Sequence, residues 1–486
     1  MLDFNFDTLK LILILLLFIL LAFYGFNNYD LGTQEIISGE SRTALDFVFT
    51  EIEQNYLNLQ YKEDKFNFSW QDKYLEARAQ WEKSKSPRED FMILGKMIST
   101  LKDGHIRLRP RENHEQELFR EHQYEELLDI RMIEGTPLII SAPRELGITG
   151  YELVALEKKN FNELLDNAVK TWGRGGNEAQ AKERLLQKEK HYQQYQLETG
   201  NLPESLTLTV KKEGKIRQVE LKESIARENF EKDTLIPLNQ GLYFQDESIV
   251  FDYSPEKEIG ILRVNDFNLH PIELKNSLDD WLNEVQDKRG LNGVILDLRY
   301  NSGGNESFRT LLEYLITEPK IVGYYRYRYS DKFKKFHQFR ALNDLISGRR
   351  SIKPAGENYS GYWSWQIYPE EEQTLSEVPI VILANSATFS AGDIFVRMAL
   401  SHNLGIVIGE ELVFSGHGLT EYQKTPEGKF ELGFGLQELR DENWQIVENK
   451  TSSPDIEVEL TKEAVREGRD NQLQKGLTIL EEAREE

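Results

Sequence analysis

The chain has 486 residues, too many for one hydrophobic core, and typical domains of about 150 residues predict about three of them. Hydrophobic residues make up 39% of the chain, enough to fill such cores, and the formal net charge of -23 disfavours nucleic acid as a partner, because a phosphate backbone binds Lys and Arg. With no cysteine, the chain can form neither a disulfide nor a thiolate metal site, and a nucleophile must come from Ser, Thr or a carboxylate.

An apolar run occupies residues 11–26, directly after Lys10. Its end lacks a small-x-small cleavage site, so we expect residues 1–30 to be a membrane anchor or an uncleaved signal segment. A buried core helix is the weaker alternative, because apolar residues cover every face of the run. An anchor predicts a membrane-anchored protein whose bulk is extracytoplasmic or periplasmic.

Residues 31–130 are predicted to form an N-terminal helical domain. Apolar residues recur at spacings of three and four in segments 44–52 and 91–101, which is the period of an amphipathic helix. The pattern changes at Asp103-Gly104, a turn signal, and alternation typical of a strand follows from Ile106. His105 therefore lies at the junction of a helix and a strand.

Residues 131–230 are predicted to form short strands around one helix near 161–172. Segments 206–210 and 218–221 alternate apolar and polar residues, and Glu213-Gly214 predicts a hairpin turn between them. This arrangement resembles the peptide-binding PDZ module. Segment 177–198 is rich in acidic and basic residues, and we interpret it as a helical insertion on the solvated surface.

From residue 231 to 486 we expect an α/β layered domain. Strands alternate with helices from Glu258 onward, and the run 378–384 is apolar enough to be a buried strand. The remaining expected strands are 259–264, 293–298 and 406–408, and the expected helices are 272–285, 308–316 and 391–399.

Two turns between a strand and a helix are candidates for chemistry, because backbone N–H groups at such turns point into the adjoining crevice. The first contains Gly303 and Gly304, where the backbone can approach a ligand closely. The second places Ser390 at the start of a helix, where an acyl-transfer nucleophile would be exposed. The same residues also fit a capping box, with Asp393 three positions after the serine.

Read together, the motifs point to one family. They are Asp297-x-Arg299-x-Asn301-x-Gly303-Gly304, the segment 385–395 around Ser390, Leu101-Lys102-Asp103-Gly104-His105, Glu448-Asn449, and Pro454-Asp455-Ile456-Glu457-Val458. From about residue 40 to its end the chain resembles the S41 serine peptidases, the tail-specific or C-terminal processing proteases, and in particular their tricorn-like branch. The resemblance implies an N-terminal helical domain, a PDZ-like domain and a ClpP/crotonase-like α/β catalytic core.

The resemblance also implies roles for individual residues. Ser390 falls on the nucleophile, His105 on the general base and Glu448 on the glutamate that orients the imidazole. Gly303, Gly304 and Ala391 fall on the backbone donors of the oxyanion hole. The implied activity is hydrolysis of unfolded or C-terminally exposed polypeptides through an acyl-enzyme, without a cofactor or a metal.

Two positions depart from the family pattern. Gly104 stands where the tricorn-like branch has a serine, and His417 stands where the processing proteases have a catalytic lysine, so His417 is an alternative base. An S41-like fold that binds a ligand or peptide without cleaving it is the alternative function.

Other polar and aromatic residues receive structural interpretations. We expect Asp103, Asp297 and Asp455 to cap turns, and the aromatic residues of 324–329 to pack on a sheet face more readily than to line a substrate groove. The other six histidines lack ligand spacing, so we predict no metal site.

Overall fold

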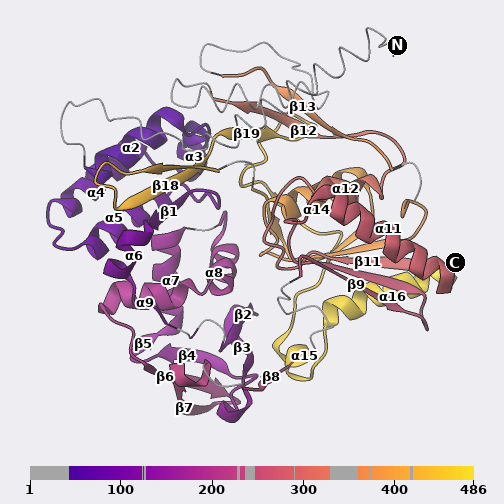
Figure 1. Ribbon diagram of the computed structural model, residues 1–486, viewed down its shortest axis with the longest axis horizontal. Helices are drawn as coiled ribbons and strands as arrows, with labels where there is room; N and C mark the ends of the chain where they lie inside the picture. The colour runs from indigo at the N-terminus through magenta and orange to yellow at the C-terminus, as the bar shows by residue number, and fades with distance from the viewer. Residues whose placement is uncertain are drawn as a thin grey trace, which may run out of the picture. The chain divides into compact units, whose positions relative to one another are not determined.

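The computed structural model describes residues 43–485 apart from 123, 125–126, 174, 227–229, 236–246, 289, 329–358, 371–373 and 416–419. Residues from Thr43 onward form one compact unit (Figure 1). The anchor expected at 1–30 lies outside the described residues. In the part of the chain that the structure describes, no helix is long and apolar enough to cross a membrane.

The expected N-terminal helices are present. They are α2 (Ala44–Asn55), α3 (Leu59–Phe66), α4 (Trp70–Trp81) and α5 (Pro87–Ser99). Helix α5 begins where the Ser86 side chain accepts a hydrogen bond from the Glu89 N–H, and Pro87 occupies its first turn. The apolar faces of these helices share one core, to which Leu45, Leu94 and Leu101 belong.

The strand after His105 joins the N-terminal helices to the C-terminal part of the chain. Strand β1 (Arg107–Pro110) pairs antiparallel with β18 (Phe430–Gly435), which pairs with β17 (Thr420–Lys424). In this register Leu108 lies opposite Leu432, and both side chains belong to the helical core. Helix α6 (Glu112–Leu118) follows β1. The pairing therefore holds the chain just after His105 against β18.

The middle region is built on an antiparallel sheet. Its strand order is β2-β3-β4-β6-β7, with β5 and β8 paired at its sides. The strands are β2 (Asp129–Ile133), β3 (Thr136–Pro143), β4 (Glu152–Leu156), β5 (Lys159–Asn160), β6 (Ser205–Lys212), β7 (Lys215–Lys222) and β8 (Lys232–Thr234). The predicted hairpin is confirmed, because β6 and β7 are joined at Glu213 and Gly214, whose φ angles of 49° and 79° suit a tight hairpin turn. The likeness of this region to a PDZ module stays a prediction.

The interpretation of 177–198 as a solvated surface helix is wrong. The segment forms α8 (Glu178–Gln187) and α9 (Lys190–Thr199), which pack beside α7 (Phe161–Trp172), and most of their side chains are buried. Two of its buried polar residues bond to other parts of the fold. The Glu183 carboxylate accepts from the Met132 N–H at 2.7 Å, and the Gln180 amide donates to the Val413 carbonyl at 3.1 Å.

The α/β layered region is confirmed. Its six-stranded sheet has the order β21-β15-β14-β11-β10-β9, parallel except for β9 at the edge. The strands are β9 (Ile249–Ser254), β10 (Ile259–Val264), β11 (Gly293–Asp297), β14 (Ile380–Ala384), β15 (Ile406–Gly409) and β21 (Ile456–Glu457). Every residue of β11 and β14 is buried, as expected for strands covered on both faces.

Helices cover both faces of this sheet (Figure 1). One face packs on α11 (Pro271–Lys288), α12 (Phe308–Glu313) and α14 (Ala391–His402), and the other on α16 (Asn471–Glu485). A second sheet consists of β13 (Trp363–Ile367), β12 (Lys320–Tyr327) and β19 (Gln437–Arg440). Its Tyr325 and Tyr327 side chains are buried in the core that α11, α12 and α14 form with the six-stranded sheet. This confirms sheet-face packing for these two aromatic residues. Short elements complete the described chain: η1 (Arg144–Leu146), α10 (Glu223–Ala226), β16 (Leu412–Val413), β20 (Thr451–Ser452) and α15 (Lys462–Arg466).

Candidate active site

The two turns that the sequence singles out meet at one edge of the parallel sheet. Strands β11 and β14 are neighbours, so the turns after their carboxyl ends lie side by side. The Phe389 N–H donates to the Asn301 carbonyl at 3.0 Å, and the Thr388 hydroxyl donates to the Leu298 carbonyl at 2.8 Å. A methyl group added to Gly303 would lie 2.5 Å from Ser390 Cβ, so only glycine fits there.

Buried ion pairs hold the first of these turns. Arg299 forms ion pairs with Asp297 at 2.6 Å and with Asp470 at 2.7 Å. Asp297 also accepts a hydrogen bond from the Arg299 N–H, as the expected turn role requires. The Arg299 side chain thereby ties β11 to the segment that leads into α16.

Ser390 has a strained backbone. It precedes α14 with φ 57° and ψ -118°, a combination that non-glycine residues rarely adopt, and such strain is found preferentially at functional sites. Its N–H donates to Asp393 Oδ2 at 2.7 Å, which is one half of the expected capping box. Its hydroxyl lies 3.1 Å from His105 Nε2. One residue thus begins the helix and presents its oxygen to an imidazole.

His105 is held by its neighbours in sequence and in space. Its ring stacks on Phe389, with centroids 4.7 Å apart, and its residue is 7% exposed. The Asp103 carboxylate accepts from the His105 N–H at 2.7 Å, and its Oδ1 lies 4.0 Å from His105 Nδ1. Asp103 also accepts from the Tyr56 hydroxyl at 2.6 Å. Asp103, which we expect to cap a turn, therefore also lies beside Nδ1 of the His105 ring.

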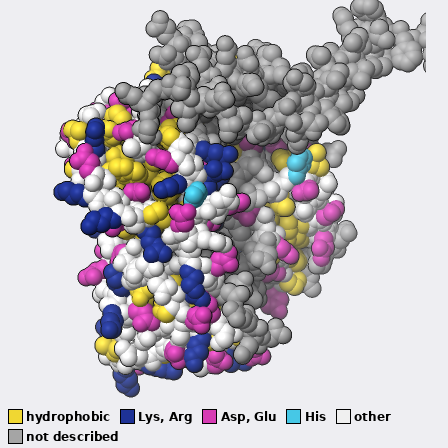
Figure 2. Space-filling view, turned by 60° about the vertical axis from the view of Figure 1, so that its left-hand side comes forward, with side chains coloured by type: hydrophobic (Ala, Val, Ile, Leu, Met, Phe, Trp, Pro, Cys, Tyr) yellow, Lys and Arg dark blue, Asp and Glu magenta, His cyan; other side chains and the backbone are white. Residues whose placement is uncertain are grey.

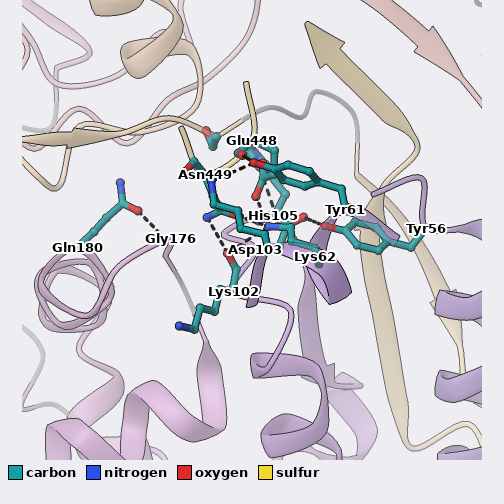
Figure 3. Close-up of polar contacts among 12 residues, drawn as sticks. Tyr56, Tyr61, Lys62, Lys102, Asp103, His105, Gly176, Gln180, Glu448 and Asn449 are labelled. Atoms are coloured by element: carbon teal, nitrogen blue, oxygen red, sulfur yellow. Dashed lines mark hydrogen bonds and ion pairs between the residues drawn. The ribbon is translucent and has the colours of Figure 1, made fainter. Parts of the chain in front are cut away.

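Glu448 lies in the same buried cluster and is paired with a lysine (Figure 3). Lys62 Nζ lies 2.5 Å from Glu448 Oε1 and donates to the Lys102 carbonyl at 3.3 Å and to the Asn449 side chain. Burial raises the pKa of Tyr56 well above its ordinary value, and the nearby charges of Asp103 and Glu448 raise it further. The site thus contains two carboxylates and one ammonium group.

Sequence reasoning did not identify Lys62. Helix α3 has many charged residues, and nothing in its sequence distinguishes a lysine that is 0% exposed from its solvated neighbours. The indication that such a lysine exists comes from its partner, Glu448. A buried carboxylate needs a compensating cation.

The oxyanion donors can be compared directly. The Gly303 N–H donates to Asn301 Oδ1 at 2.9 Å, so it is already engaged. Among the described residues, the N–H groups of Gly304 and Ala391 donate no hydrogen bond. Ala391 opens α14, where N–H groups lack acceptors within the helix. The geometry favours Gly304 and Ala391 over Gly303 as the donor pair, and the oxyanion hole itself stays a prediction.

The buried carboxyl of Asp393 holds the backbone of Ser390. Burial raises the pKa of the Asp393 carboxyl to about 8, and hydrogen bonds from Ser415 and from the Ser390 N–H offset part of this effect. The Ser415 hydroxyl donates to Asp393 at 2.5 Å and lies 3.1 Å from the Ser390 nitrogen, so it braces the same turn. Sequence motifs did not reveal Ser415.

Steric crowding explains why residue 104 is a glycine. A methyl group added there would lie 2.6 Å from Arg184 Nη1 and 2.6 Å from Phe389 Cε2. The Arg184 guanidinium, from the middle region, lies 3.2 Å from the centroid of the Phe389 ring. The space that a serine would need is therefore filled by α8. His417, the alternative base, lies outside the described residues.

Comparison with known proteins points to the family that the sequence motifs resemble. Residues 258–458 match the model of peptidase family S41. This part of the chain is therefore similar to an S41 peptidase domain. The matched residues include the turn with Gly303 and Gly304, Ser390 and Glu448. No curated protein sequence matches the chain.

Several solved structures share the fold. Mature CPAF is 15% identical, with a TM-score of 0.63 over 91% of this chain and 97% of its own. Mature CPAF complexed with lactacystin is 15% identical, with a TM-score of 0.64 over 91% and 98%. A putative peptidase from Parabacteroides merdae is 16% identical, with a TM-score of 0.50 over 91% and 97%. These similarities extend the shared fold beyond the S41 domain to the N-terminal helices and the middle sheet.

Proposed function

We propose that the protein is a serine endopeptidase that hydrolyses unfolded or C-terminally exposed polypeptides through an acyl-enzyme. The observation that carries the proposal is the 3.1 Å contact between Ser390 Oγ and His105 Nε2. The two residues are far apart in sequence and come from different regions of the fold, and a serine hydroxyl needs a base at this distance to become a nucleophile at neutral pH.

In the first half of the reaction, Ser390 Oγ attacks the peptide carbonyl carbon and His105 Nε2 takes the hydroxyl proton. The negative charge that develops on the carbonyl oxygen is stabilised by the N–H groups of Gly304 and Ala391, and one such donor contributes about 3 to 4 kcal/mol in other serine enzymes. The imidazolium then gives its proton to the leaving amine, which releases the C-terminal part of the substrate.

In the second half, water attacks the ester. His105 takes a proton from the water and returns one to Ser390 Oγ, which restores the free enzyme. Asp103 and Glu448 stabilise the imidazolium in both halves, because two buried carboxylates outweigh the single charge of Lys62. The neighbourhood of His105 is thus suited to a transient positive charge.

The peptidase proposal is tested by Ser390→Ala in the full chain, with an unfolded polypeptide as substrate. We expect cleavage to be lost and the fold to be kept, since a helix cap contributes only about 1 kcal/mol. Ser401→Ala, an exposed position on the same helix α14, is the matched control and should cleave normally. Undiminished cleavage by folded Ser390→Ala would contradict Ser390 as the nucleophile, and absence of cleavage by the unsubstituted protein would favour the alternative, a binding protein with an S41-like fold.

We also propose that residues 1–30 anchor the protein in a membrane with its bulk outside the cytoplasm. The support is the apolar run at 11–26 and the absence of a cleavage site after it. Fractionation of cells that express the full chain tests this, and recovery of the intact chain from the soluble cytoplasmic fraction contradicts it.

A further inference from the structure

A polar cavity of about 610 Å³ lies beside β1, the strand that begins two residues after His105. Its volume is within the range of about 300 to 1,000 Å³ that is usual for ligand sites. Five of its lining side chains are cationic, against three carboxylates. The cations are Arg107, Arg109, Arg111, Lys190 and Lys424. A net positive cavity stands out in a chain whose formal net charge is -23. Figure 2 shows the face that carries the N-terminal helices, with Lys and Arg in dark blue.

The alternation of β1 gathers the arginines. Ile106 and Leu108 point into the helical core, so Arg107 and Arg109 extend from the opposite face of the strand, where they line the cavity. Strand β17, which ends at Lys424, contributes from the same sheet, and α9 contributes Lys190 at its first residue. Three separate elements thus deliver cations to one space.

Two of these cations are not neutralised. Glu431 pairs with Arg109 at 2.8 Å and lies 3.8 Å from Arg111, so one carboxylate serves two arginines. Among the described residues, neither Arg107 nor Lys424 has a carboxylate within ion-pair distance. The Arg107 Nε–H is also buried without an acceptor in this part of the chain. Buried donors nearly always have a partner, so this arginine is suited to bind an anionic group.

We propose that this cavity is an exosite that binds acidic side chains of the polypeptide substrate. The bound chain is a substrate only if the proposed peptidase function holds. The binding of an acidic chain is independent of cleavage. Arg107 and His105 are two residues apart, so their Cα atoms are separated by at most about 7 Å. A substrate therefore needs only a few residues beyond the cleaved bond to reach the cavity.

Electrostatics favours an acidic segment at this cavity. The charge of the whole chain repels acidic polypeptides, but at physiological salt the Debye length is about 8 Å, so the nearby cations determine the interaction. Attraction within the cavity and repulsion elsewhere would select substrates by the position of their acidic block relative to the cleaved bond.

The test uses two peptides that differ only in a block of four glutamates or four glutamines near the cleaved bond. Binding is measured by fluorescence anisotropy with the full chain carrying Ser390→Ala, which separates binding from cleavage. We expect the acidic peptide to bind more tightly, and its affinity to fall about fivefold with each of Arg107→Gln and Lys424→Gln. In the described part of the chain neither position forms an ion pair, so their substitution leaves no described carboxylate unpaired. Lys215→Gln, an exposed position on β7, is the matched control and should bind the acidic peptide normally.

Cleavage by the enzyme with Ser390 intact gives a second readout. The ratio of kcat/KM for the acidic and the neutral peptide should exceed one and approach one in the Arg107→Gln, Lys424→Gln double variant. Equal binding of both peptides, or an acidic preference that the double variant retains, would overturn the exosite. Inorganic phosphate should compete only weakly; if it displaces the peptide at micromolar concentration, the cavity is a site for a small anion instead. Absence of cleavage with an intact acidic preference in binding would overturn the peptidase function and leave the exosite standing.

Discussion

Lys62 Nζ lies 2.5 Å from Glu448 Oε1, and both side chains are almost completely buried. The lysine belongs to the N-terminal helices and the glutamate to the S41 domain, so this ion pair joins the part of the chain that carries His105 to the part that carries Ser390. A buried pair of this kind is sensitive to the loss of one member, because the remaining charge is then left in a medium of low polarity.

We therefore expect Lys62→Met to lower the free energy of unfolding by about 3 to 5 kcal/mol. Glu448→Met should cost a similar amount, since it leaves the ammonium group of Lys62 buried beside neutral partners. The Lys62→Met, Glu448→Met double variant should cost less than the sum of the two single changes. Urea unfolding of the three variants measures this, and strictly additive losses would show that the pair is not coupled.

Gly104→Ala should impair catalysis through Phe389. The added methyl group would meet Arg184 and the Phe389 ring at 2.6 Å, and this buried ring contacts His105 and Arg184, so we expect its displacement to shift the backbone beside Ser390. A shift of the nucleophile by about 1 Å is expected to lower kcat by roughly tenfold to a hundredfold. Gly214→Ala in the β6–β7 hairpin has open space around it and serves as a control that strains only its own turn. Normal kcat in a folded Gly104→Ala enzyme would refute the steric argument.

The carboxyl of Asp393 should make stability depend on pH. Burial raises its pKa to about 8, whereas in the unfolded chain it titrates near about 3.9. Between these values the folded state holds a proton that the unfolded state has lost, so the contribution to stability is fully present below about pH 4 and is lost as the pH rises to about 8.

Asp393→Asn removes this titration. Between pH 5 and pH 8 the free energy of unfolding of the unsubstituted protein should fall relative to that of the variant, by on the order of 2 to 4 kcal/mol. Urea midpoints at the two pH values provide the measurement. If the free energy of unfolding changes equally with pH in the two proteins, Asp393 is ionised throughout this range in the folded state.

The sequence was sufficient to predict the α/β layered region and both functional turns, because buried parallel strands and glycine-rich turns leave local patterns. It also placed His105 and Ser390 correctly with respect to secondary structure. It was misleading for 177–198, since a helix that buries its charges through specific partners has the same composition as a solvated one. Lys62, Ser415 and Arg184 could not be found from sequence, because each is defined by a contact with a distant segment.

Substitutions of His105 and Ser390 should have strongly non-additive effects on activity. His105→Ala should lose about as much activity as Ser390→Ala, and the double variant should lose little more than either, because the two groups act as one unit. Steady-state kcat/KM for the three variants tests this. If His105→Ala stays active, the base must be another group, and His417→Ala is then the variant to measure.

Activation of Ser390 by His105 can be measured by covalent labelling. The purified full chain is treated with a serine-directed acylating probe at neutral pH, and the modified residue is located by mass mapping. We expect rapid labelling of Ser390 in the unsubstituted protein and a labelling rate that is lower by about a hundredfold or more in His105→Ala. Labelling of a different serine, or labelling of Ser390 at an unchanged rate in His105→Ala, would contradict it.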